Sequence, residues 1–111
     1  MNEAVERFMK YMKRRYPNSS TVKHYSSDLL LFSRLVNKPP RSITRQDVER
    51  FVEDQLQRGL AATTVNRRLA AIRHFFEFLA DEAQDESWAN PVVWLHHKVK
   101  TGRPLPRDLS E

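Results

Sequence analysis

The apolar residues between Gly59 and Leu79 recur with the period of an α-helix. Steps of four and three place them on one stripe: Val65, Leu69, Ile72, Phe76 and Leu79. The polar face and its flank carry hydrogen-bonding side chains: Thr63, Asn66, Arg67, Arg73 and His74. Taken alone, this pattern is better explained by an ordinary helix with a buried spine and a solvated face. The same side chains can bind phosphates and base edges, so a nucleic-acid surface stays open.

The same spacing predicts further helices over residues 3–15, 20–36 and 45–58. Pro17 ends the first of these, because proline inside a helix removes a backbone hydrogen bond. The apolar side of that helix is either core or a docking surface for another subunit. In the helix over 20–36, the polar side chains of the first turns lie away from the apolar spine: Lys23, His24 and Ser27. We therefore expect its N-terminal half to be exposed.

Three stretches contain residues that are typical of helix N-caps. Thr44 and an acid three residues later resemble a capping box, with Asp in place of the usual Glu. The start of the long helix, placed at residues 62–80, is open between a cap at Ala61 and a cap at Thr63. Asn90-Pro91 is interpreted as the cap and first-turn proline of a short fifth helix.

No stretch alternates with the period of a β-strand, and the chain has only two glycines. We therefore expect an all-α fold, with four main helices and a short fifth one. A chain of 111 residues has room for one domain with one core. We place this domain at residues 1–100. Residues 101–111 contain Gly102, Pro104 and Pro106 and are interpreted as a linker.

Basic residues outnumber acidic ones by 19 to 14, which gives a formal net charge of +5. This excess favours an anionic partner. The charges are also segregated. From Lys10 to Arg45 there are nine basic residues and one acid, Asp28, whereas Glu77 to Glu86 holds five acids and no base. We expect a basic side that meets a polyanion, and an acidic end that points away from it or toward a protein.

Several other classes of chemistry find no support in the sequence. The chain has no cysteine, which excludes a disulfide framework and a thiolate metal site. A helix would point the adjacent His96 and His97 about 100° apart, which is poor geometry for one metal ion. We expect neither a metal nor a cofactor. No apolar run approaches the roughly 20 residues that span a bilayer, and the start lacks the apolar core of a secretion signal. We expect a cytoplasmic protein with no membrane partner.

Five segments occur in the order that one protein family shows: TVKHYSSDLLLF, SITRQDVERFV, GLAATTVNRRLAAIRHFFEFL, Asn90-Pro91 and the ending GRPLPRDLSE. Together they resemble the N-terminal core-binding domain of tyrosine site-specific recombinases of the phage integrase and Xer type, over about residues 3–111. The resemblance implies a small orthogonal helical bundle, called SAM-like, that forms half of a clamp around a DNA duplex. Ala61 departs from the Ser that the family usually has at this cap.

The resemblance also implies that the second and fourth helices approach the major groove. Their exposed side chains are then the candidate DNA-binding residues: Lys23, His24, Ser27, Thr63, Asn66, Arg67, Arg73 and His74. By chemistry and position, we interpret Lys23, Arg67 and Arg73 as phosphate clamps. Asn66 and His74 are the candidate readers of base edges.

In that family, a tyrosine nucleophile is assisted by paired arginines, a lysine and a His-x-x-Arg element in a C-terminal domain. This chain has no His-x-x-Arg pattern, and its three tyrosines lack such surroundings, so we assign no catalytic residue. We expect a monomeric fragment that binds double-stranded DNA without cutting it. Its parent would act in DNA integration or recombination together with other recombinase subunits. The alternative is a helical protein-protein interaction module, which the apolar side of the first helix and the acidic end favour.

Overall fold

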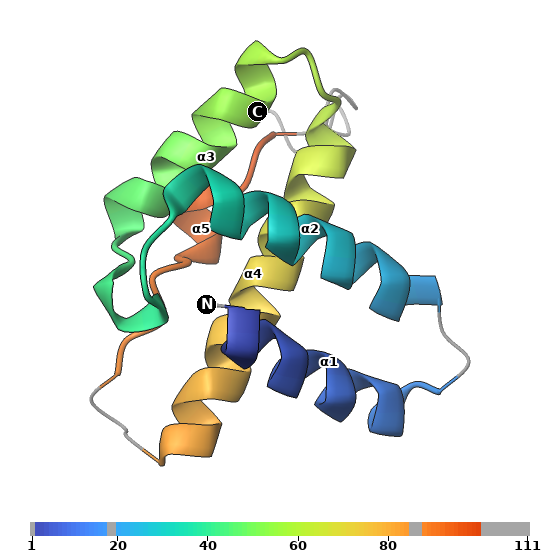
Figure 1. The fold of residues 1–111 in the computed structure, drawn as a ribbon. Helices are drawn as coiled ribbons and strands as arrows, with labels where there is room; N and C mark the ends of the chain where they lie inside the picture. The colour runs from blue at the N-terminus through green and yellow to red at the C-terminus, as the bar shows by residue number, and fades with distance from the viewer. Residues whose placement is uncertain (1, 18–19, 85–87, 101–111) are drawn as a thin grey trace, which may run out of the picture.

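The computed structural model describes residues 2–17, 20–84 and 88–100. Its elements are α1 (Asn2–Arg15), α2 (Ser20–Val36), the 3-10 turn η1 (Pro40–Ser42), α3 (Arg45–Gln57), α4 (Ala62–Ala83) and α5 (Trp94–His97), shown in Figure 1. The described residues contain no strand, so the all-α prediction is confirmed, and so are the four main helices. The linker predicted at 101–111 lies outside the described residues. Within those residues, every helix is too short or too polar to span a bilayer.

The longest helix, α4, has 22 residues and organises the bundle. In Figure 1, α4 runs from one end of the molecule to the other, and α1 and α2 cross in front of it. The third and fifth helices lie together to one side, and α3 contacts α2, α4 and α5. The other three main helices, α1, α2 and α3, therefore all pack against α4, as expected for a helix with a long, continuous apolar stripe.

That apolar stripe is the centre of the core. Val65, Leu69 and Ile72 have no exposed surface, and the remaining two stripe residues are at most 3% exposed. Aromatic rings join the other helices to it and to one another. Phe32 of α2 meets Phe51 of α3 edge to face, with ring centroids 5.2 Å apart. The buried spine that the sequence predicts is thus the surface on which the other helices pack.

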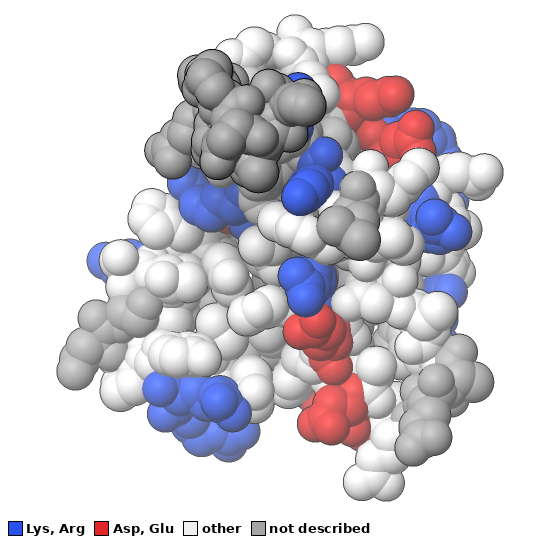
Figure 2. Space-filling view, turned by 180° about the vertical axis from the view of Figure 1, so that it is seen from behind, with Lys and Arg blue, Asp and Glu red and all other residues white. Residues whose placement is uncertain are grey.

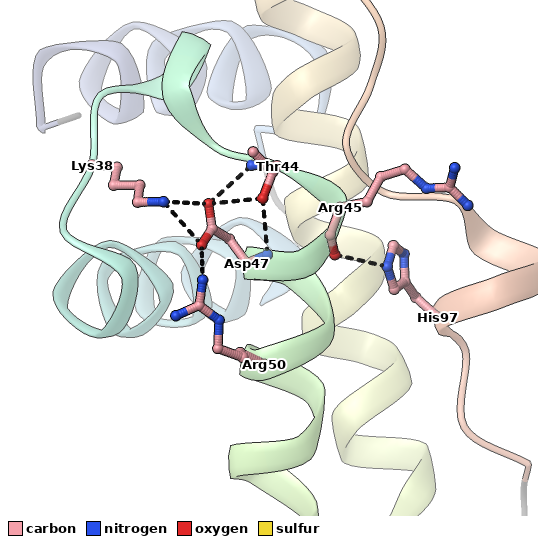
Figure 3. A network of polar contacts seen from close by, with 6 residues as sticks. All are labelled: Lys38, Thr44, Arg45, Asp47, Arg50 and His97. Carbon is pink, nitrogen blue, oxygen red and sulfur yellow. Dashed lines mark hydrogen bonds and ion pairs between the residues drawn. The ribbon is translucent and has the colours of Figure 1, made fainter.

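Asp47 fixes the start of α3, as Figure 3 shows. The Thr44 hydroxyl accepts a hydrogen bond from the Asp47 amide at 3.2 Å, and the Asp47 carboxylate accepts one from the Thr44 amide at 3.0 Å. This confirms the capping box. The same carboxylate binds Lys38 Nζ at 2.9 Å and Arg50 Nη2 at 2.8 Å. Burial raises the pKa of the Asp47 carboxyl, but the bonds from Thr44 and Lys38 outweigh burial and hold this pKa below its ordinary value.

The start of α4 has no side-chain cap. Ala61 is the N-cap residue, with an extended backbone at φ −67° and ψ 149°, and it makes no side-chain hydrogen bond. The structure thus selects Ala61 over Thr63. Just before it, Gly59 adopts φ 84°, a left-handed conformation that glycine takes without steric cost.

Residues 88–100, which we term the C-terminal strap, differ from the prediction. A helix start at Asn90-Pro91 is wrong, because α5 begins at Trp94 and spans four residues. Asn90 instead closes a turn: its Oδ1 accepts a hydrogen bond from the Val92 amide at 2.9 Å. Its Nδ2 donates to the carbonyl of Arg73 at 3.1 Å. The side chain that was expected to cap a helix therefore ties the strap to α4.

Truncation of matched leucines tests this core. Leu69→Ala removes a side chain with no exposed surface, so we expect the free energy of unfolding to fall by about 2–5 kcal/mol. Leu56 is 42% exposed, and Leu56→Ala should cost about 1 kcal/mol or less. Urea denaturation followed by circular dichroism measures both. Equal losses for the two variants would contradict the assignment of the core.

Candidate nucleic-acid interface

A buried carboxylate joins α2 to α4. Asp28 of α2 is 2% exposed. Arg67 of α4 donates to it twice, from Nη2 to Oδ1 at 3.1 Å and from Nε to Oδ2 at 3.3 Å. The next residue, Arg68, places its Nε 3.4 Å from Oδ1 and donates from Nη1 to Gln55 of α3. One negative charge therefore lies between two positive charges, and the junction keeps a net positive charge.

Arg67 stays at the surface despite this pairing. Its side chain is 42% exposed, compared with 20% for Arg68. A guanidinium has five N–H donors, and Asp28 engages two of those on Arg67, through Nε and Nη2. The remaining donors can bind an anion while Asp28 holds the group in position.

The predicted residues of α2 and of the outer face of α4 are exposed: Lys23, His24, Ser27, Thr63, Arg67 and His74. The ring of His74 stands edge-on to Tyr25 of α2, with centroids 5.8 Å apart. Burial, followed by the charge of Asp28, raises the pKa of the Tyr25 hydroxyl, so Tyr25 adds no negative charge here. Contacts from Tyr25 and Asp28 thus join the two helices into one surface.

Asn66 and Arg73 lie on the other flank of α4, against the strap. The half-buried Asn66 accepts the Val99 N–H on Oδ1 at 2.7 Å and donates from Nδ2 to the Val99 carbonyl at 2.8 Å. The guanidinium of Arg73 lies 5.6 Å from the centroid of the Trp94 ring, and its Nε lies 3.3 Å from a carboxylate oxygen of Glu77. These two residues therefore contact the strap, unlike the six on α2 and the outer face of α4.

Charge is unevenly distributed over the rear of the molecule. Figure 2 shows acidic side chains in two places on this face, low in the middle and at the upper right, with basic groups scattered between and beside them. Glu77 and Asp81, in the C-terminal half of α4, are exposed. Arg7 of α1 binds Glu82 with two nitrogens, each at 3.0 Å. The acidic end of α4 is thus partly neutralised by α1 and Arg73, and the N-terminal half carries the polar, basic face.

His97 anchors the strap to α3, as Figure 3 shows. It is 4% exposed. Its Nδ1 accepts the Val93 N–H at 3.0 Å, which leaves the ring proton on Nε2, and Nε2 lies 3.1 Å from the carbonyl oxygen of Arg45. Burial lowers the pKa of this imidazole below its ordinary value, and the bond to Arg45 offsets only part of that effect. His97 is therefore neutral at pH 7.

The structure overturns one argument against a metal ion. Ligand atoms of His96, His97 and Glu49 lie within 4.8 Å of one another, although a helix was expected to separate the two imidazoles. The centroids of the two imidazole rings are 5.2 Å apart. Both ring nitrogens of His97 already contact backbone atoms, however, and a metal ion would have to displace one of those contacts. We assign no metal to this cluster.

Asp28 is the residue of the candidate interface that sequence reasoning missed. One feature of the sequence could have identified it, since Asp28 is the only acidic residue between Lys10 and Arg45. Helical spacing also places it beside the apolar spine of α2, between Tyr25 and Leu29, where an unpaired charge would be costly. A lone acid at such a position indicates a basic partner on a neighbouring helix.

The helical fold and the family match place the chain in the class of SAM-like domains. More narrowly, the chain belongs to the family described as phage integrase, N-terminal SAM-like domain, which matches residues 5–83. This confirms the family that the sequence resembles.

Among curated proteins, the chain is similar to tyrosine recombinases. It is 31% identical to tyrosine recombinase XerC of Staphylococcus carnosus over 104 residues, which covers 90% of this chain and 34% of that protein. It is 34% identical to XerC of Roseiflexus castenholzii over 115 residues, with 99% and 36% covered, and 28% identical to XerD of Listeria monocytogenes over 116 residues, with 99% and 38% covered. The chain thus spans about a third of the length of these relatives. No solved structure matches.

Asp28→Asn tests the junction of α2 and α4. The change leaves the guanidinium of Arg68 without its carboxylate, and we expect the free energy of unfolding to fall by about 3 kcal/mol. Asp81→Asn makes the same charge change at an exposed position of α4 and should alter stability by no more than about 0.5 kcal/mol. Urea denaturation measures both. An Asp28→Asn variant as stable as the wild type would show that the pair does not hold these helices together.

His97 makes stability depend on pH. The unfolded chain binds a proton at the ordinary histidine pKa of about 6.5, whereas the folded chain binds one only at lower pH because its pKa is lowered. Stability is therefore full above about pH 6.5 and is lost as the pH falls through the folded pKa. His97→Gln should remove this loss, and His96→Gln, at an exposed position, should retain it. Denaturation curves at neutral and mildly acidic pH provide the measurement, and identical pH profiles for all three proteins would contradict the assignment.

Proposed function

We propose that this chain is the DNA-binding domain of a tyrosine recombinase and grips the duplex of a recombination half-site through α2 and α4. The proposal is supported by the family and the relatives, which are named as tyrosine recombinases. One observation supports it: Asp28 of α2 holds the exposed Arg67 of α4, and both helices carry further exposed polar side chains. Strand breakage and rejoining belong, in this proposal, to the rest of a longer recombinase.

Phosphate contacts provide most of the proposed binding. Lys23 supplies a mobile ammonium group, and Arg67 supplies a guanidinium that Asp28 already holds in place. A group held in its bound position loses little freedom on binding, so Arg67 should be the stronger of the two anchors. The hydroxyl groups of Ser27 and Thr63 can donate to neighbouring phosphate oxygens.

Sequence readout is the smaller part of the proposed contact. His24 and His74 are exposed beside the junction and can reach base edges. Asn66 leaves the proposed set of base readers, because its amide binds the backbone of Val99. We therefore propose a domain that positions a recombinase mainly through the DNA backbone and adds little specificity of its own.

A protein-interaction module is the second candidate, and one surface favours it. A groove of about 620 Å³ between α1 and α2 is lined by Val5, Met9 and Leu30, with two lysines at its edge. Leu30 is 40% exposed there. Such a groove fits a protein partner, including another recombinase subunit.

Titration of a labelled duplex at several salt concentrations tests the first candidate. Affinity should fall as salt rises, because each phosphate contact releases counterions, and Lys23→Gln should reduce the slope of log K against log salt by about 0.9. Lys10→Gln makes the same charge change in the α1–α2 groove and should leave the slope unchanged. Affinity that does not respond to salt would count against the proposal. No binding at low salt, together with a stable self-complex, would favour the interaction module.

A further inference from the structure

Two successive residues of α4 hold two different elements. Arg67 binds Asp28 of α2, and Asn66 binds the strap at Val99. Successive residues of a helix are turned by about 100°, so α2 and the strap meet α4 on different flanks. The exposed face that carries Thr63 and Arg67 lies between them. Any duplex on this face would therefore have α2 along one side and the strap along the other.

Asn66 fixes the backbone of the strap where it leaves α5. It binds both the N–H and the carbonyl of Val99, as an adjacent β-strand would. Exposure alternates here: Val99 packs partly buried against the core, whereas Lys98 and Lys100 on either side of it are exposed. Neither lysine forms an ion pair with any residue in the described part of the chain. The contact with Asn66 therefore holds the backbone between two exposed lysines, which have no ion pair within the described residues.

We propose that Lys98 and Lys100 form a second phosphate-binding site, which Asn66 positions by holding the backbone between them. This inference rests on the proposed function and extends it: the duplex would be gripped from the α2 side and from the strap side of α4. The ligand is the sugar-phosphate backbone, because ammonium groups recognise phosphate charge without reading bases. Asn66 adds no charge to the site and acts only through the strap.

Charge removal on the strap tests the site. The variant carrying Lys98→Gln and Lys100→Gln loses two surface charges and should keep its fold, which circular dichroism checks. With a fluorescein-labelled random duplex, we expect the slope of log K against log salt to fall by about 1.8, and affinity at about 0.1 M salt to drop by tenfold or more. The matched control carries Lys10→Gln and Lys13→Gln in the α1–α2 groove, and its slope should stay close to that of the wild type.

The outcomes separate this inference from the proposed function. If the Lys98/Lys100 variant and the Lys10/Lys13 variant lose the same affinity and the same salt slope, the strap site is overturned. Such a result would show that only the net charge of the protein matters. An unchanged strap variant, alongside a weakened Lys23→Gln variant, would overturn the strap site and leave the proposed function intact. If the wild-type chain itself shows no salt-dependent binding to DNA, the proposed function is overturned.

A double-mutant cycle tests the positioning role of Asn66. Asn66→Ala should expose the Val99 amide to rapid hydrogen exchange and weaken DNA binding several-fold. In the background that lacks both strap lysines, Asn66→Ala should have no further effect on affinity, because Asn66 acts through those lysines. An equal loss in both backgrounds would show that Asn66 contacts DNA directly and would overturn the positioning role. The paired lysine variants decide the site independently if Asn66→Ala impairs folding.

Discussion

A single buried carboxylate sets the geometry on which the proposed DNA surface depends. Arg67 and Arg68 approach Asp28 from successive positions of α4, and Gln55 of α3 binds the second guanidinium. A buried charge is costly without a partner, so α2, α3 and α4 cannot shift relative to one another without losing this pairing. The pairing also leaves the guanidinium of Arg67 at the surface in a fixed position. Fold stability and the presentation of the proposed phosphate-binding group thus depend on the same contact.

The central helix α4 has a different partner on each of its sides. Its apolar stripe forms the core, one flank meets α2, and the other flank holds the strap through Asn66 and the carbonyl of Arg73. Along its length the charge changes as well. The acids of the C-terminal half are tied in part to Arg7 of α1, and the N-terminal half is polar and basic. This gradient would direct a polyanion to the N-terminal half of α4, which lies between α2 and the strap.

Local patterns in the sequence predicted the helices, and long-range contacts decided the site. Apolar spacing and the capping box of Thr44 depend on residues within a few positions of each other, so they could be identified from the chain alone. A helical wheel shows which side is polar, but it cannot show that a neighbour covers that side. Asn66 was therefore grouped with exposed residues, although Val99, 33 positions further on, packs against it. Arg73 is exposed as predicted, and its guanidinium also lies over the ring of Trp94. The turn at Asn90 was missed because an Asn-Pro pair suits both a helix start and a turn, and the contact of Asn90 with the carbonyl of Arg73 lies 17 positions away.

The central claim is that DNA binds across α2 and α4, around the Asp28 junction. Nuclear magnetic resonance of the chain, labelled with nitrogen-15 and titrated with duplex DNA, tests it residue by residue. The claim predicts that backbone amide shifts change along the exposed faces of α2 and α4, at residues such as Ser27 and Arg67, and on the strap at Lys100. Changes confined to the groove between α1 and α2, at Met9 and Leu30, would contradict it.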